Sequence, residues 1–206
     1  PLWSRGLGDV YKRQDGCCGS GGFLIEALAA MWKKVESSPK LSQAAKNELK
    51  NDIATKCIYG IDSAKDPALA RIARMNMYLH GDGGSAIYQL DALDKGLAEE
   101  NNASPESRSE LRDFKRVLKD NAEGFADVAL TNPPFARDYE RKKRGGGRAY
   151  APSVLDAYEL SYDGPAEILP KAKLKSSAMF LERYLDFLKP GGRLVSVIDD
   201  SVLAVS

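Results

Sequence analysis

The fold of this chain is decided by one segment, Ala126-Asp127-Val128-Ala129-Leu130-Thr131-Asn132-Pro133-Pro134-Phe135. Residues 126–130 form a short apolar run that is typical of a buried strand. Because two consecutive prolines can neither continue a strand ladder nor start a helix normally, the chain must leave the sheet there in a stiff, extended turn. Open α/β sheets place their chemistry in such turns, at the carboxyl ends of parallel strands. We therefore expect an α/β fold with a functional site at residues 132–135.

This turn presents groups that suit a flat, nitrogen-containing substrate. The amide oxygen of Asn132 and the carbonyl oxygen of Pro133, which has no competing N–H, can accept both hydrogens of an exocyclic amine. The ring of Phe135 can stack on a base, and Pro134 keeps the turn stiff. Short motifs also occur by chance, so an ordinary strand exit with Phe135 in the core is the alternative.

The composition is that of an ordinary globular domain. With 206 residues, of which 43% are apolar and 29% charged, the chain is long enough for one domain with a full core. The net charge of +1 means that contact with nucleic acid must come from local clustering of basic residues. No apolar run approaches the length that spans a membrane, and we expect a cytoplasmic protein.

The cysteines and the single histidine do not form a metal-binding pattern. Cys17, Cys18 and Cys57 make no Cys-x-x-Cys pair, and His80 has no companion at ligand spacing. We therefore expect no metal site, and the thiols favour a reducing compartment.

Residues 1–14 show neither strand alternation nor a helical face. They resemble a translated sequencing-adapter peptide, so we interpret them as a non-native or disordered leader outside the fold. A central parallel strand should precede Asp15, but Lys12, Arg13 and Gln14 are long polar side chains that suit a buried strand poorly. The first strand is therefore doubtful, and because the chain stops soon after a strand at Arg193–Ile198, we expect truncation at both ends.

A glycine-rich loop, residues 15–23, leads into an expected helix at Phe23–Val35. Glycines let a backbone approach a ligand closely, and the free N–H groups at a helix start favour negative charge. Many nucleotide-binding proteins share such loops, and a tight turn with no ligand is the alternative. The helix is indicated by apolar residues at helical spacing: Leu24, Leu28, Met31 and Val35.

Single acids follow the next two expected strands. Asp62 comes just past a strand at Cys57–Ile61, after a polar helix in residues 40–56, and stands where an acid can hold ribose hydroxyls. Asp91 follows a strand at Ala86–Leu90 and could accept the exocyclic amine of an adenine ring.

Helix signals account for much of the remaining chain. Asp66-Pro67 reads as an N-cap and N1 pair for a helix at Pro67–Leu79, which leaves Asp62 free to bind a ligand. The polar stretch Glu99–Arg108 reads as a surface insertion. Another amphipathic helix is expected at Ser177–Leu188.

A basic loop, residues 136–150, follows the Asn-Pro-Pro-Phe turn directly. Such a run is often only a solvated loop, but beside a substrate turn it would contact phosphates and add salt-sensitive affinity. The residues that we expect to bind DNA are Arg137, Arg141, Lys142, Lys143, Arg144 and Arg148.

In this order, the glycine loop, the two acids and the Asn-Pro-Pro-Phe turn resemble the amino-methylating DNA methyltransferases, specifically the modification subunit of type I restriction-modification systems. The resemblance covers Asp15 to Leu203. It implies a Rossmann-like, S-adenosylmethionine-dependent methyltransferase fold with helices on both faces of the sheet, of which residues 15–206 are a partial catalytic domain. Its most specific stretches are Cys18-Gly19-Ser20-Gly21-Gly22-Phe23, Arg74-Met75-Asn76-Met77-Tyr78-Leu79-His80-Gly81, Asn132–Phe135 and Leu188-Lys189-Pro190-Gly191-Gly192-Arg193.

The resemblance implies a role for each matching residue. Asp62 would hold the ribose of S-adenosylmethionine and Asp91 its adenine. Asn132 and Pro133 would grip the N6 amine of a flipped-out adenine in DNA, with Phe135 stacked on the base. The methionine part of the cofactor would be held by the glycine loop: Asp15, Cys18, Gly19, Ser20, Gly21, Gly22 and Phe23.

The resemblance also implies partners, and it has departures. Double-stranded DNA would be the substrate, and the full-length protein would join a specificity subunit and a second modification subunit. Gly16 and Asp199 stand where proline is common in the family. Rival interpretations are a methyltransferase acting on a ribosomal RNA base or a protein glutamine, and an inactive fragment that binds DNA. A nicotinamide oxidoreductase would leave the Asn-Pro-Pro-Phe turn without a role.

Overall fold

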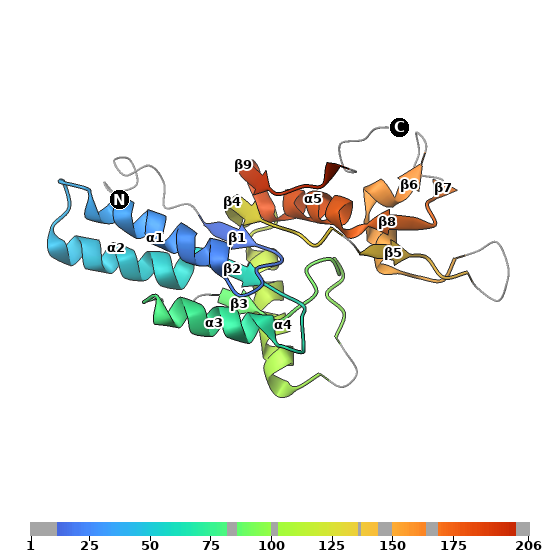
Figure 1. Cartoon of the computed structure of the whole chain (residues 1–206), viewed down its shortest axis with the longest axis horizontal. Helices are drawn as coiled ribbons and strands as arrows, with labels where there is room; N and C mark the ends of the chain where they lie inside the picture. Colours follow the sequence, from blue (N-terminus) through green and yellow to red (C-terminus); the bar gives the residue numbers. More distant parts are fainter. Residues whose placement is uncertain are drawn as a thin grey trace.

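The computed structural model describes residues 12–81, 86–99, 103–135, 137–143, 150–163 and 169–200. At its centre is a five-stranded sheet with the strand order β3-β2-β1-β4-β9 (Figure 1). Every pairing in this sheet is parallel, which confirms the α/β prediction. The strands are β1 (Arg13–Asp15), β2 (Ile58–Ile61), β3 (Ala86–Tyr88), β4 (Ala126–Thr131) and β9 (Leu188–Ser196).

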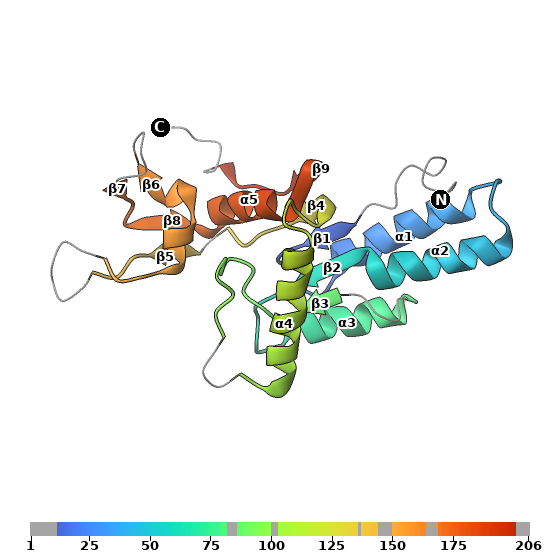
Figure 2. The same ribbon diagram turned by 180° about the vertical axis from the view of Figure 1, so that it is seen from behind.

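Helices cover both faces of the sheet, as the resemblance implied. They are α1 (Gly22–Glu36), α2 (Gln43–Lys56), α3 (Leu69–Leu79), α4 (Pro105–Asp120) and α5 (Ser176–Phe187). The first three share one core with Ile58 of β2, and the other two share a second core with Tyr59 of the same strand. Adjacent strand residues point to opposite faces, so these two clusters lie on opposite sides of the sheet. Figure 2 shows α4 in front of the strands when the molecule is seen from behind.

A smaller lobe follows β4 at the carboxyl side of the sheet (Figure 1). Two antiparallel pairs form it, together with the short 3-10 helices η1 (Val154–Ala157) and η2 (Glu159–Ser161). The pairs are β5 (Asp138–Glu140) with β8 (Lys173–Lys175), and β6 (Tyr162–Asp163) with β7 (Leu169–Pro170). Because the chain returns from this lobe into α5, the lobe is held beside the turn that leaves β4.

The doubt about the first strand was wrong, because Arg13 and Gln14 belong to β1. Arg13 pairs with residues of both β2 and β4, and its N–H donates to the Cys57 carbonyl at 2.7 Å. A strand between two others gains its ladder from backbone groups, which do not depend on apolar side chains. The polar side chains still carry a cost: the amide of Gln14 is buried with no hydrogen-bond partner in the described part of the chain.

Three expected boundaries also change. Asp66 does not cap α3, which begins at Leu69 after Ala68, whose carbonyl accepts from the N–H of Arg71 at 3.0 Å. The stretch expected as a surface insertion already contains the start of α4, where the Ser104 hydroxyl accepts from a backbone N–H at 3.1 Å. Strand β9 begins at Leu188, five residues before the expected start, with a shift in its register to β4.

Candidate functional site

The carboxyl ends of the strands open into one cavity of about 520 Å³, called here the site cavity. It brings together residues that sequence reasoning had placed at separate strand ends: Gly19, Asp62, Asp91 and the whole turn Asn132–Phe135. Gly16, Cys17 and Phe180 also line it. A concave site with a few convergent polar groups is what a small-molecule or nucleotide ligand requires.

Several predicted residues of the glycine loop support this cavity without lining it. Cys18 has a buried side chain and donates its N–H to the Ile61 carbonyl at 2.9 Å. Ser20 accepts at its carbonyl from the Asn76 side chain at 3.0 Å, which ties the loop to α3. Gly21 stands at the N-cap of α1 with a φ of 89°, and Gly22 and Phe23 begin that helix. Their contribution is to fix the course of the loop.

Asp62 holds the loop directly. Its Oδ2 accepts from the N–H of Gly19 at 2.9 Å, and its Oδ1 accepts from the N–H of Ala64 at the same distance. Because each carboxylate oxygen has more than one acceptor site, the side chain can also accept from a ligand in the cavity. Asp62 therefore caps a local turn through the Ala64 N–H, while the N-cap of α3 is Ala68, and its role as a cofactor ligand stays a prediction.

The Asn-Pro-Pro-Phe turn is bonded to α5 on one side and faces the site cavity on the other. Ser176 donates its hydroxyl to the Pro134 carbonyl at 2.7 Å, which fixes the turn against the start of α5. Asn132 is exposed, and its amide has no hydrogen-bond partner within the described ranges. Phe135 is partly exposed and lines the cavity rather than the core. The cavity wall at this turn therefore consists of the exposed Asn132 amide, the buried Pro133 and the partly exposed Phe135 ring.

Sequence reasoning missed the α5 residues of the site. Ser176 lies 42 residues from the turn that it holds, and no local pattern indicates such a contact. The helical spacing of Phe180 indicated only a core position, yet this ring lines the site cavity as well.

Asp15 lies beneath the loop and is only 2% exposed. Its Oδ1 accepts from the Cys17 N–H at 3.1 Å and from the Thr131 hydroxyl at 2.9 Å. Burial raises the pKa of the Asp15 carboxyl to about 6, while these hydrogen bonds act in the opposite direction. Burial also raises the pKa of the Cys17 thiol to about 12, so this thiol is protonated at neutral pH and is a poor nucleophile.

The structure explains why position 16 is glycine, where the family pattern has proline. The Gly16 N–H donates to the Tyr184 hydroxyl at 3.0 Å, and proline has no N–H to donate. A Cβ at position 16 would also lie 3.0 Å from that hydroxyl and 3.1 Å from the Gln14 amide nitrogen. Tyr184 and Gly16 therefore fit each other.

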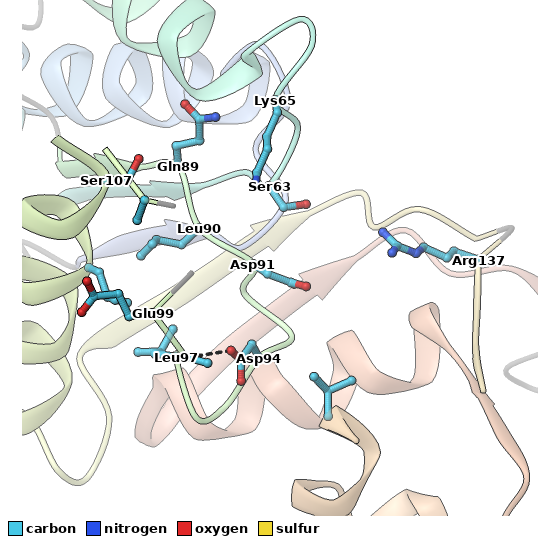
Figure 3. Close-up of a pocket in the computed structure, with 14 residues that line it drawn as sticks. Ser63, Lys65, Gln89, Leu90, Asp91, Asp94, Leu97, Glu99, Ser107 and Arg137 are labelled. Atoms are coloured by element: carbon cyan, nitrogen blue, oxygen red, sulfur yellow. Dashed lines mark hydrogen bonds between the residues drawn. The ribbon is translucent and has the colours of Figure 1, made fainter. Parts of the chain in front are cut away.

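A second cavity of about 420 Å³ adjoins the first and shares Ser63 and Asp91 with it (Figure 3). Asp91 is exposed, and its Oδ1 accepts from the Leu93 N–H at 2.9 Å. In Figure 3, Leu90 lies to one side of Asp91 and Arg137 to the other. The Asp91 carboxylate is thus shared by both cavities.

The prediction that Arg141 binds DNA was wrong. Its side chain is 2% exposed and forms an ion pair with Asp156. It also donates to the Lys171 carbonyl at 3.1 Å and to the Ser161 hydroxyl at 2.9 Å. A buried guanidinium with its donors already engaged is a structural element of the lobe and cannot reach a phosphate.

The other residues of the basic loop divide into two groups. Arg137, Lys142 and Lys143 are exposed, and the Arg137 guanidinium lies over the ring of Tyr139, 4.8 Å from its centroid. Their role in binding DNA stays a prediction. The two remaining predicted residues, Arg144 and Arg148, lie outside the described residues.

The described ranges contain no group of three or more His, Cys, Asp or Glu side chains placed to hold a metal ion. Within those ranges, none of the helices has the uninterrupted apolar length that a bilayer crossing requires.

Comparison with known proteins gives a family and a fold. A family model described as N-6 DNA Methylase matches residues 7–206. A modification subunit of a putative type I restriction enzyme from Vibrio vulnificus YJ016 is similar in structure, with a TM-score of 0.55 and 22% identity over 96% of this chain and 31% of its own. The type I restriction enzyme EcoKI M protein has a TM-score of 0.50 and 21% identity over 94% of this chain and 30% of its own. At these identities the two structures support the fold, and this chain spans about a third of their length.

Proposed function

Because the chain belongs to the N-6 DNA methylase family, we propose that it transfers a methyl group from S-adenosylmethionine to the N6 amine of an adenine in DNA, as the modification subunit of a type I restriction-modification system. One observation carries this proposal. The glycine loop, Asp62, Asp91 and the Asn132–Phe135 turn line a single cavity, so groups that suit a cofactor face groups that suit an aryl amine.

The residues of the cavity fit S-adenosylmethionine. Asp62 offers carboxylate oxygens to ribose hydroxyls at the end of β2, and Asp91 offers an exposed carboxylate to an adenine amine. Gly16, Cys17 and Gly19 line the cavity and would offer backbone carbonyl oxygens to the ammonium group of the methionine part, because their N–H groups already donate to Tyr184, Asp15 and Asp62. The buried Asp15 contributes by holding the turn of this loop. When bound, the cofactor supplies a methyl group on a sulfonium.

The turn supplies the chemistry on the substrate side. An aryl amine is a poor nucleophile because its lone pair is delocalised into the ring. When Asn132 and Pro133 accept both of its hydrogens, they favour a pyramidal nitrogen whose lone pair can attack in line. Phe135 stacks on the flipped-out base, and the Ser176 hydroxyl keeps Pro134 in place. No covalent intermediate with the protein is needed, in agreement with the protonated Cys17 thiol.

The remaining parts of the proposal concern DNA and partner subunits. Arg137, Lys142 and Lys143, together with Arg144 and Arg148, would contact phosphates near the turn, and this contact should weaken with salt. In the full-length protein we propose assembly with a specificity subunit and a second modification subunit, working in the cytoplasm on double-stranded DNA.

The first test is calorimetric titration of the chain with S-adenosylmethionine. Asp62→Ala should weaken binding, because it removes a cavity carboxylate and the anchor of Gly19. Asn132→Ala should leave binding largely intact, because its exposed amide faces the substrate. Circular dichroism should show that both variants fold.

Methylation assays then separate the substrate classes. Transfer to DNA, but not to RNA or a glutamine-containing protein, and its loss in Asn132→Ala would complete the case. Transfer to RNA or protein instead would overturn the DNA assignment. Absence of cofactor binding by the folded chain would overturn catalysis by this chain and leave an inactive DNA-binding fragment.

A further inference from the structure

A chain of hydrogen bonds runs beneath the site cavity. The Gly16 N–H donates to the Tyr184 oxygen at 3.0 Å, and the Tyr184 and Thr131 hydroxyls lie 2.5 Å apart. The Thr131 hydroxyl donates to Asp15 Oδ1 at 2.9 Å. Because a threonine hydroxyl has only one proton, which goes to Asp15, the Thr131 oxygen accepts from its other neighbours. These are the Tyr184 hydroxyl and the Cys17 thiol, whose sulfur lies 3.0 Å from Thr131 Oγ1 and 3.6 Å from the Tyr184 oxygen. The order is therefore Gly16, Tyr184, Thr131, Asp15.

This series of hydrogen bonds connects three elements that meet at the cavity. Asp15 and Gly16 end β1 and begin the glycine loop, Thr131 ends β4 directly before Asn132, and Tyr184 belongs to α5. All four residues are buried, and the Tyr184 side chain is fully enclosed. Buried hydrogen bonds in series polarise one another and hold a fixed geometry. The series thus joins the wall of the cavity that faces the cofactor to the turn that faces the substrate.

We propose that Tyr184 and Thr131 are positioning residues that hold the glycine loop in a fixed position relative to the substrate turn, Asn132–Phe135. Ionised Asp15 sets the direction in which their hydroxyl groups donate hydrogen bonds. This inference rests on the function proposed above and deepens it. Neither hydroxyl lines the site cavity, so both residues act through Gly16, Cys17 and Asn132, which do.

The direction in which these hydroxyl groups donate their hydrogen bonds depends on the charge of Asp15. A carboxylate can only accept, whereas a carboxylic acid can also donate, which would free the Thr131 hydroxyl to turn away. The titratable groups that face Asp15 are the Cys17 and Cys18 thiols, the Asp62 carboxylate and the Tyr184 phenol. None of these groups is cationic, so hydrogen bonds are what favour the ionised form. Removing a link should therefore raise the pKa of Asp15.

The experiment measures the Asp15 titration directly, and separately from catalysis. Carbon-13 NMR of the whole chain follows the carboxyl carbons with pH, and the resonance lost in Asp15→Asn is assigned to Asp15. The variants are Thr131→Val and Tyr184→Phe, which keep side-chain shape but delete a hydroxyl. Tyr158→Phe is the matched control, because Tyr158 is also fully buried and donates to the Leu93 carbonyl at 2.7 Å, but takes no part in the hydrogen-bond series around Asp15. Affinity for S-adenosylmethionine is measured over the same pH range.

The parent chain should titrate near pH 6 at Asp15. In Thr131→Val the midpoint should rise by roughly 1 pH unit, because a hydrogen bond to a charged group is lost. Tyr184→Phe should raise the Asp15 midpoint by a smaller amount. Thr131→Ser, which keeps a hydroxyl, and Tyr158→Phe should both keep the midpoint of the parent chain. Cofactor affinity should fall on acidification with the same midpoint in each protein.

Two results would overturn the inference: midpoints that do not move in Thr131→Val and Tyr184→Phe, or moved midpoints with a cofactor affinity that keeps the parent pH dependence. If the folded parent chain binds no cofactor at any pH, the proposed function fails instead. The NMR midpoints would then still decide whether the four groups form one coupled chain.

Discussion

Replacing Asp15 with asparagine should stabilise the fold at neutral pH, although the same residue is proposed to support cofactor binding. Burial raises the pKa of this carboxyl from its ordinary value of 3.8 to about 6. Each pKa unit corresponds to about 1.36 kcal/mol, so keeping Asp15 ionised costs the folded state about 3 kcal/mol. Asparagine offers the same oxygen to Cys17 and Thr131 without a charge to bury.

The pH dependence of this effect has a definite sign. Because its pKa is higher in the folded state, the folded chain binds more protons than the unfolded chain between pH 3.8 and about 6. The penalty from Asp15 is therefore absent below the lower value and grows as the pH rises through the upper one. Between about pH 3.5 and about pH 7.5 the difference in stability between Asp15→Asn and the parent chain should shift by about 3 kcal/mol in favour of the variant.

Urea unfolding followed by circular dichroism, with both proteins in the same buffers across this range, measures the difference. Calorimetry at neutral pH should show weaker binding of S-adenosylmethionine by the more stable variant. A stability difference that does not change with pH would refute the assignment of the penalty to ionised Asp15.

Further predictions concern the clamp, the backbone and the basic loop. Ser176→Ala removes the hydroxyl that holds the substrate turn at 2.7 Å, so initial rates should show a kcat about tenfold lower with cofactor affinity retained. Gly124→Ala should lower the midpoint of thermal unfolding by more than about 5 °C, because the φ of Gly124 is 98° and a Cβ there would collide with the backbone of Leu188 in β9. Gly191→Ala should lower the midpoint by less, because Gly191 has a φ of 79° but no atom near the position of a Cβ. Arg141→Met should lower that midpoint because its side chain is buried, whereas Lys143→Gln should leave it unchanged and reduce the salt dependence of DNA binding by about one phosphate contact.

Features with strong local signals could be predicted from the sequence. The apolar spacing of Phe23–Val35 and Ser177–Leu188 located α1 and α5 to within one residue at each end, because an amphipathic helix repeats its signal over several turns. The site cavity could also be predicted in outline. Parallel strands end at one edge of a sheet, so the acids after β2 and β3 and the turn after β4 had to converge.

Contacts between distant segments could not be predicted in this way. The Gly16–Tyr184 bond joins residues 168 positions apart, and the clamp on the substrate turn joins residues 42 apart. The basic loop shows a different limit. Arg141 and Lys142 are adjacent and both basic, yet one is buried in an ion pair and the other is exposed. Only the packing of the lobe separates a structural arginine from a lysine that is free to bind a phosphate.

The end of β1 shows why the first strand was hard to recognise and why it is polar. Gln14 buries an amide without a partner and Asp15 buries a carboxylate, so both weaken the folded state. A purely apolar strand end would avoid these costs, but it would present nothing to the Cys17 N–H or to Thr131. Local rules of stability are broken where a site needs polar groups below its surface. The polar residues that argued against a strand therefore belong to the same strand end that orders the glycine loop, which is why β1 can be both the central strand of the sheet and its least apolar one.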